Sequence, residues 1–410
     1  MTAVPAIRTR LSSKTIGWSV ALAAGLVFLV LAGRSYSQAN YTFLIATAIL
    51  DGHLGLNTGP AWLNELVPMG GHFYSVFPLG AVLSVLPFSL LVWLRLLGSY
   101  PADWVVALLA AGCAGLAYCY TYARRDLTQP NRALLGLWLV GGTWFMTNLL
   151  FSGAWQIALG LAVLGELIAL VFTVVRPRPV LAGLGFAIAF GNRTELLLLA
   201  PILAWLLIRS DVAQWRRTDH WQPIVRKLAG FCAVPLLLGL ATLWYNHARF
   251  GSWTDFGYTR IPGVMNLPLL HDGLFSFTPV AKNAQAMLFQ GWKSLPAWPY
   301  WVPDGFGGSI VLASPFLLLV AQPWRGDRLK CGLAVIAIIV TTAALWAHGD
   351  PGGWQYSYRY ALELLPWFLV IFVELLPTRV RPLELGLWLV SVVVSGYATY
   401  LFLWTNYVHP

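Results

Sequence analysis

Apolar segments of about 20 residues, the length that crosses the hydrocarbon of a bilayer, recur along the whole of this chain. The chain is 58% hydrophobic and only 10% charged, whereas a soluble domain carries a charged fraction of about 25%. The sequence contains no soluble domain, internal repeat or low-complexity tract. We therefore expect a single all-α polytopic membrane domain over residues 1–410.

Clusters of Lys and Arg between the apolar segments predict which loops face the cytoplasm, because short cytoplasmic loops are enriched in both residues. These clusters lie at 8–14, 124–132, 176–178, 209–227, 325–330 and 379–381. About eleven transmembrane helices fit between them, with the N-terminus inside and the C-terminus outside. The predicted spans are 16–33, 103–122, 133–151, 155–175, 179–192, 195–209, 229–248, 308–323, 331–347, 359–376 and 384–404. The first also has the character of a signal peptide, but no clean small-x-small site follows it, so we expect a retained helix.

The apolar run 76–98 is the exception in this assignment. If it crossed the membrane, the basic cluster 124–132 would lie outside and every later segment would be inverted. The run contains Pro78, Pro87 and Arg95, and an arginine at the centre of a lipid-facing helix costs about 2.5–3.5 kcal/mol. We predict a helix at the outer interface; the alternative is a true span with a compensating change elsewhere.

Two large outer loops follow from this assignment, 34–102 and 249–307, and we expect the function to lie in them and in the span ends beneath. The net charge of +10 is dispersed in short clusters, which is typical of topology signals and excludes a nucleic-acid groove. The four cysteines lie in or beside apolar segments, where core roles are expected rather than disulfides or metal binding.

The stretch GNRTE at 191–195 joins two short apolar segments as a tight hairpin. Its two charges would be expensive below the membrane surface unless they faced a polar cavity. Two interpretations remain open: Arg193 binds a phosphate, or Arg193 and Glu195 form a structural pair.

A second stretch, GGWQYSYRYALELLP at 352–366, combines aromatic residues with Arg359 and Glu363. These two are four residues apart, so they share one face of a helix. Aromatic rings beside polar groups are typical of a sugar site, but the aromatic belt of any membrane interface has the same composition. A third stretch runs from 246–260 to 271–288, where a further short interfacial helix is expected.

Taken together, these features resemble the GT-C superfamily of integral-membrane glycosyltransferases. Its members use polyprenyl-phosphate sugars and include protein O-mannosyltransferases and lipid A aminoarabinose transferases. The chain is similar to an uncharacterised bacterial branch in seven short motifs: Asn40–Tyr41, Asn64–Glu65–Leu66, Gly71–His72–Phe73–Tyr74, Phe77–Pro78–Leu79, RFGS at 249–252, GLFS at 273–276 and YRY at 358–360. Better-known members carry an acidic residue just after the first span, whereas RSYSQANY here has none, so the base is Glu65 or Asp51, with Glu65 favoured.

The resemblance implies an inverting sugar transfer at the outer face of the bacterial cytoplasmic membrane, with a carboxylate base and a cation at the departing phosphate. The implied catalytic residues are Glu65 and Asp51, and the donor-phosphate residues are Arg193, Arg359, Arg249 and Lys282, with Arg193 contributing more than Arg359. The implied sugar and acceptor residues are Asn40, His72, Tyr74, Glu195, Tyr258, Asn283, Trp354, Gln355, Tyr358 and Glu363.

The expected partners are a polyprenyl-phosphate-linked sugar, membrane lipid, and a glycan, lipid or protein hydroxyl as acceptor, with no nucleic acid. We expect no dedicated metal site, although carboxylates are able to hold a divalent cation. A lipid transporter or flippase is the first alternative. It predicts ionisable residues along a mid-membrane path, and Glu166 alone fits. A catalytically degenerate scaffold is the second alternative, supported by the missing early acid.

Overall fold

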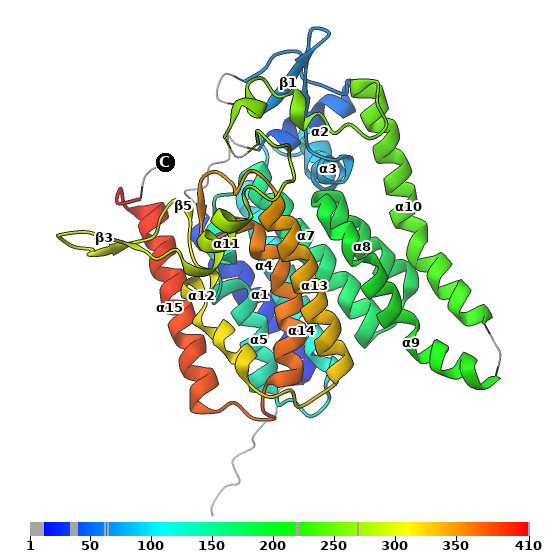
Figure 1. Ribbon diagram of the computed structural model, residues 1–410, viewed down its shortest axis with the longest axis vertical. Helices are drawn as coiled ribbons and strands as arrows, with labels where there is room; N and C mark the ends of the chain where they lie inside the picture. Colours follow the sequence, from blue (N-terminus) through cyan, green and yellow to red (C-terminus); the bar gives the residue numbers. More distant parts are fainter. Residues whose placement is uncertain are drawn as a thin grey trace, which may run out of the picture.

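The computed structural model describes residues 12–32, 40–60, 63, 65–218, 221–268 and 270–408, and their side chains other than those of 216–218. Arg8 and Arg10 of the first basic cluster, residues 34–39 and Asn64 lie outside this part of the chain. Within it the fold is mostly helical, and the paired strands form three two-stranded sheets (Figure 1). The sequence-based expectation of an all-α membrane protein is confirmed at this level.

Seven helices in the described residues are long and apolar enough to cross a membrane. Each coincides with a span expected from the sequence. They are α1 (Ser13–Leu31), α4 (Ala102–Tyr120) continued by η2 (Thr121–Ala123), α7 (Ala154–Leu170) continued by η3 (Val171–Val175), η4 (Thr194–Leu199) continued by α9 (Ala200–Thr218), α10 (Gln222–Phe250), α13 (Arg328–Ala347) and α15 (Pro382–Trp404).

Four further expected spans form shorter or interrupted helices. They are α5 (Gln129–Gly141) with α6 (Phe145–Leu150), α8 (Pro179–Asn192), α12 (Ile310–Ala313) with η7 (Pro315–Ala321), and η8 (Arg359–Leu364) with α14 (Leu365–Leu375). Local chemistry explains two of the breaks. Gly141 and Gly142 weaken the helix between α5 and α6. Pro315 lacks the N–H that would continue α12.

One end of the bundle carries a cap, which we define as α2 (Tyr41–Leu50), α3 (Leu79–Trp93) and the hairpin of β1 (Leu66–Met69) and β2 (His72–Ser75). In Figure 1 the cap lies above α7 and α8, and α3 is seen almost along its axis, across the end of the bundle. We call this end the cap end. Residues 76–98 therefore contribute a 15-residue helix, with Pro87 inside it, to the cap.

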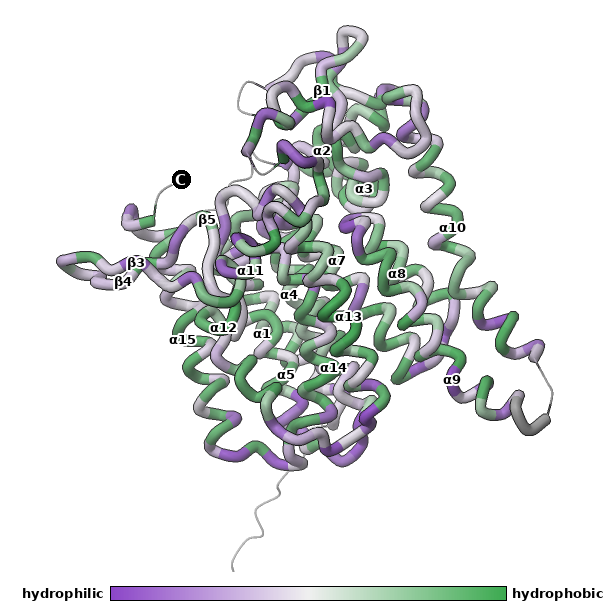
Figure 2. Tube along the Cα trace, in the orientation of Figure 1, coloured by the Kyte–Doolittle hydropathy of each residue, from purple (hydrophilic) through white to green (hydrophobic). Residues whose placement is uncertain are grey.

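The opposite end, which we call the basic end, carries hydrophilic loops (Figure 2). Arg124, Arg325 and Lys330 meet there beside Glu374. Arg124 donates to the backbone oxygens of Val373, Glu374 and Leu376, the last over 2.7 Å. Lys330 and Glu374 form a buried ion pair nearby. The three bonds from Arg124 satisfy carbonyl groups at the end of α14, which have no partner within the helix.

Close backbone contacts fix the cap on the bundle and α7 on α8. A Cβ atom built on Gly80, in the first turn of α3, would lie 2.4 Å from the Cα of Gly191 in α8. A Cβ on Gly165 of α7 would lie 2.5 Å from the backbone nitrogen of Ala189. Small residues allow this approach between apolar helices. The contacts bring the ends of α3, α7 and α8 together.

The second long loop contributes short elements at the cap end and beside α15. They are η5 (Tyr258–Arg260), η6 (Val264–Asn266), α11 (Val280–Phe289), β3 (Lys293–Ser294), β4 (Trp301–Val302) and β5 (Phe306–Gly307). β5 pairs in parallel with β6 (Gln355–Tyr356), which lies directly before η8. This pairing joins the second loop to the segment that carries Arg359.

Candidate active site

A cavity of about 240 Å³ lies where the cap meets the helix bundle. Its lining comes from six separate parts of the chain. The lining residues are Glu65, Val76, Phe77 and Pro78 from the cap, Trp155 from α7, Asn192, Arg193, Thr194 and Glu195 between α8 and α9, Phe256, Tyr258, Leu274 and Phe275 from the second loop, His348 and Asp350 after α13, and Arg359 and Tyr360 in η8. The fold therefore brings together residues that lie up to 295 positions apart in the sequence.

Glu65 is the cavity carboxylate best placed to act as a base. Its Oε2 accepts hydrogen bonds from the indole Nε1 of Trp155 at 2.7 Å and from the hydroxyl of Tyr41 at 3.1 Å. Its Oε1 has no hydrogen-bond partner among the described residues. The two donors orient the carboxyl and leave one oxygen for a ligand.

Burial raises the pKa of Glu65, and the hydrogen bond from Trp155 and the charge of Arg359 offset only part of this rise. A carboxylate with a raised pKa holds a proton more strongly and is a better base. Burial and the nearby Glu65 charge also raise the pKa of Tyr41 well above its ordinary value. Tyr41 therefore stays protonated and acts as a hydrogen-bond donor to Glu65.

Arg359 supplies positive charge to the same cavity. Its Nη1 donates to the carbonyl of Trp354 at 3.4 Å and its Nη2 to the hydroxyl of Tyr360 at 3.3 Å. Its Nε is buried without a partner, and none of the described carboxylates forms an ion pair with it. A buried donor without a partner is costly unless a ligand satisfies it, so Arg359 is suited to an anion.

Arg193 lies in the cavity wall but is already paired. It donates to Glu195 through Nε and Nη2 and to Oε1 of Glu363 through Nε at 2.8 Å. Its guanidinium also lies 4.5 Å from the ring centroid of Tyr360. Of the two sequence-based interpretations, this geometry matches the structural pair and adds Glu363 as a second carboxylate. Glu195 lines the cavity, whereas Glu363 is fully buried behind it.

Tyr258 of the second loop and Asp350 form a polar corner of the cavity. The Tyr258 hydroxyl donates to Oδ2 of Asp350 at 3.3 Å, and Oδ1 accepts from the backbone of Gly352 at 2.9 Å. The His348 ring packs edge-on against Tyr258, Phe275 and Tyr360. Hydroxyl, carboxylate and aromatic faces together are suited to a polyhydroxylated ligand.

Asp51 lies outside the cavity lining. It ends α2, is exposed, and accepts a hydrogen bond from the Trp93 indole at 2.8 Å. This bond ties α2 to the end of α3. Of the two base candidates, only Glu65 faces the cavity.

Three other predicted residues of the first loop also lie outside the lining. Asn40 is buried at the start of α2 and donates to the carbonyl of Ser152 at 3.4 Å. His72 and Tyr74 belong to β2, and the Tyr74 ring packs on Phe250 at the end of α10. The contacts of Asn40 and Tyr74 attach the cap to the helix bundle and to α10.

Arg249 fastens the cap to α10. It is buried and donates to the carbonyl of Ser75, the carbonyl of Tyr245 and the side chain of Asn246. It does not line the cavity. Its positive charge is therefore bound by acceptors within the protein rather than by a donor phosphate.

Lys282 and Asn283 lie on α11, away from the cavity lining. Lys282 is exposed. Asn283 is buried and donates to the carbonyls of Trp346 and His348 at 3.0 and 2.9 Å. Asn283 therefore positions the cavity residue His348 from outside.

The residues before Arg359 hold it in position from outside the cavity. Gln355 accepts from the backbone N–H of Arg359 at 2.9 Å and donates to Phe306 at 3.2 Å. Trp354 packs among Phe151, Phe306 and Phe402, and the Tyr358 hydroxyl donates to Leu345 at 3.3 Å. None of the three lines the cavity.

Sequence reasoning assigned no role to the cavity residues Trp155, His348 and Asp350, and Tyr360 entered only through the YRY motif. The signal that might have found them is their position, since each lies at or just beyond a span end. No group of three or more His, Cys, Asp or Glu in the described residues is arranged to hold a metal ion.

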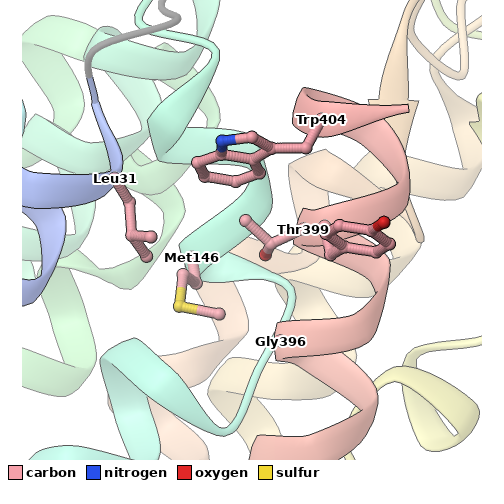
Figure 3. Close-up of a pocket in the computed structure, with 6 residues that line it drawn as sticks. Leu31, Met146, Gly396, Thr399 and Trp404 are labelled. Carbon is pink, nitrogen blue, oxygen red and sulfur yellow. The ribbon is translucent and has the colours of Figure 1, made fainter. Parts of the chain in front are cut away.

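A second cavity, of about 340 Å³, lies between α1, α6 and α15 (Figure 3). Leu31, Met146, Gly396, Thr399, Tyr400 and Trp404 line it. The Thr399 hydroxyl is bonded to Thr147 and to the carbonyl of Ser395. The cavity is mostly apolar, and no carboxylate or histidine is among its lining residues.

Searches with this chain against protein-family models, curated proteins and solved structures found no match. The long apolar helices define the class of protein, an all-α membrane protein. Its function has to be argued from the chemistry of the cavity.

Proposed function

We propose that this protein is a membrane glycosyltransferase that moves a sugar from a polyprenyl phosphate to an acceptor hydroxyl. The observation that carries the proposal is the presence of Glu65 and Arg359 in one cavity. One is a carboxylate with a free oxygen and a raised pKa, and the other is a buried cation with a free donor. A base and an anion-stabilising group are the two parts that an inverting transfer needs.

In the proposed reaction, the acceptor oxygen attacks the anomeric carbon while Oε1 of Glu65 takes the hydroxyl proton. A new glycosidic bond forms, and the bond between the carbon and the phosphate oxygen breaks. The electron pair leaves on the polyprenyl phosphate, where Arg359 donates hydrogen bonds to the developing charge. Tyr258 and Asp350 would bind sugar hydroxyls, and Trp155 would hold the base in position.

The same proposal includes the placement of the site. We propose that all eleven sequence-based spans cross the membrane, with the four interrupted segments completing the bundle around α7. The positive residues at the basic end favour its cytoplasmic location, so the cap end and its cavity would face outward. A bacterial cytoplasmic membrane with donor and acceptor in its outer leaflet fits this orientation.

The test is transfer by the purified protein in phospholipid vesicles, with radiolabelled polyprenyl-phosphate hexoses and pentoses as donors and extracted cell membranes as acceptor. We expect label to leave the donor with one of these sugars, and Glu65→Gln to abolish most of this loss. Asp51→Asn is the matched control, since Asp51 is an exposed carboxylate of the same loop outside the cavity. A folded protein that turns over none of the donors would overturn the proposal.

A further inference from the structure

A hairpin between α11 and α12 projects away from the helices. β3 and β4 pair antiparallel, with Lys293 opposite Val302 and Ser294 opposite Trp301. The backbone N–H of Leu295 donates to Tyr300 at 2.7 Å and extends this pairing into the turn. In Figure 1 the hairpin extends sideways from α15 rather than along the axis of the bundle.

Contacts with α15 fix the depth of this hairpin. Trp292 stacks on Tyr397, with ring centroids 5.9 Å apart and an angle of 22° between the planes. The Tyr397 hydroxyl donates to the carbonyl of Pro299 at 3.4 Å, and Trp298 packs edge-on against Tyr407 at 5.6 Å. α15 is long and apolar enough to span a membrane and ends at Trp404. The hairpin therefore lies at the level where this span leaves the hydrocarbon.

Large aromatic side chains dominate the free surface of the hairpin. Trp298, Tyr300 and Trp301 are 53%, 55% and 58% exposed. Lys293 is the one charged residue between positions 291 and 303, and its Nζ pairs with Asp304 at 3.0 Å. Trp and Tyr are the residues that favour the boundary between hydrocarbon and headgroups, because each has an apolar ring and a polar tip.

The exposed apolar surface of α15 continues into this aromatic surface. Leu389, Val393 and Tyr400 are exposed along α15, and Phe289 and Phe306 are exposed beside the hairpin. A membrane-spanning helix presents such side chains to lipid. One lipid-facing surface therefore runs up α15 and turns outward along the hairpin.

We propose that residues 293–302 form an interfacial anchor that lies in the headgroup layer at the cap end and binds phospholipid with its aromatic rings. The partner is the bilayer itself. The inference concerns depth and does not rest on the proposed function or on which side of the membrane the cap end faces. The same aromatic rings could in principle contact a second membrane protein or a glycan in water. The test below gives a different result for each of these partners.

The test places a nitroxide spin label at Ala297, in the exposed turn, in the full chain reconstituted into phosphatidylcholine vesicles. Cys113, Cys119, Cys232 and Cys331 are first replaced by Ala. Collisions of the label with oxygen, which concentrates in lipid, and with a water-soluble nickel chelate report its depth. Leu237→Cys on exposed α10 is the lipid reference, and His271→Cys in the second loop is the water reference.

We expect the Ala297 label to have an oxygen-to-nickel ratio between the two references. Replacing both Trp298 and Trp301 by Ser should shift it toward the water reference without changing either reference. A ratio equal to that of His271 would overturn the anchor, because the hairpin would then lie in water. A label shielded from both probes would also overturn it and would indicate a protein contact.

Discussion

Arg193 donates a hydrogen bond from Nε to Oε1 of Glu363 over 2.8 Å, although 170 residues separate the two in sequence. The bond joins the turn between α8 and α9 to η8, four residues beyond Arg359. Because Glu195 engages the same guanidinium, Arg193 holds two carboxylates, one that lines the cavity and one buried behind it. The pair thus anchors η8, which also carries Arg359, whose Nε has no hydrogen-bond partner among the described residues.

Substitution of Glu65 should affect turnover far more than folding. Glu65→Gln keeps the shape and both hydrogen bonds but removes the proton acceptor, so we expect kcat to fall by about 10²–10⁴-fold. Thermal unfolding in vesicles should change little. Asp51→Asn should leave kcat within about twofold of the unsubstituted protein, and a large loss there would transfer the role of base to Asp51.

The pH dependence of kcat/KM gives a separate test of Glu65. The base works only when ionised, and burial raises its pKa above the ordinary value of 4.5. Activity should therefore be lost as the pH falls through this raised pKa, at a higher pH than for an exposed glutamate. An acid limb at or below 4.5 would contradict the buried position of the base.

Substitutions of Arg359 and of Arg193 should differ in how strongly they weaken the use of the donor. Arg359→Lys loses the planar fork that can hold two phosphate oxygens. The loss of a charge-assisted bond is worth roughly 1.5–3 kcal/mol, or about 10–150-fold in donor kcat/KM. Arg193→Lys should have the smaller effect on the donor, which reverses the order expected from sequence. The reversal follows from the two carboxylates that already occupy Arg193.

Arg193 should instead affect stability. Removing one partner of a buried ion pair costs about 3–5 kcal/mol because the other charge stays buried. Arg193→Gln should lower the midpoint of thermal unfolding, and the double change Arg193→Gln/Glu363→Gln should recover part of the loss. If Arg193→Gln left unfolding unchanged and weakened donor use more than Arg359→Gln, the assignment of the two arginines would have to be exchanged.

The contact between α3 and α8 predicts a strong effect of one methyl group. Gly80→Ala places a Cβ 2.4 Å from the Cα of Gly191 in the unrelaxed structure, so the cap must move. Overpacking of this kind typically costs about 1–3 kcal/mol. Gly239→Ala on α10 is the control, since its Cβ meets nothing within 4 Å, and there we expect no loss. Equal unfolding midpoints for the two variants would show that the cap does not rest on this contact.

Sequence patterning locates the helices well because span length and Lys/Arg placement act locally. Every long helix in the described residues overlaps an expected span, and residues 76–98 yield a short cap helix. The count of eleven crossings stays a prediction, since α5 with α6, α8, α12 with η7 and η8 with α14 are short or broken. Propensity alone does not decide whether a broken helix spans a membrane.

The site was harder to predict, because the same residue type serves binding and assembly. Arg249 and Arg359 were both expected to bind the donor phosphate. One binds the carbonyl of Ser75 in the cap, and the other faces the cavity. Nothing in the local sequence separates these roles, because the acceptor of Arg249 in the cap lies 174 residues away and the cavity beside Arg359 is formed by distant parts of the chain. Trp155 escaped notice because a tryptophan at a span end is ordinary in membrane proteins.

The attachment of the cap to α10 links the cavity to the bilayer. Arg249 near the end of α10 donates to Ser75 of β2, and β2 pairs with β1, which directly follows Glu65. At 1.5 Å per residue the 29 residues of α10 extend about 43 Å, well beyond a hydrocarbon thickness of about 30 Å. Such a helix accommodates the mismatch by tilting, and α10 runs obliquely beside the bundle (Figure 1). A thinner bilayer should tilt α10 further and load its bond to the cap, while the hydrogen bond from Trp155 and the contact of Gly80 with Gly191 hold Glu65 on the bundle.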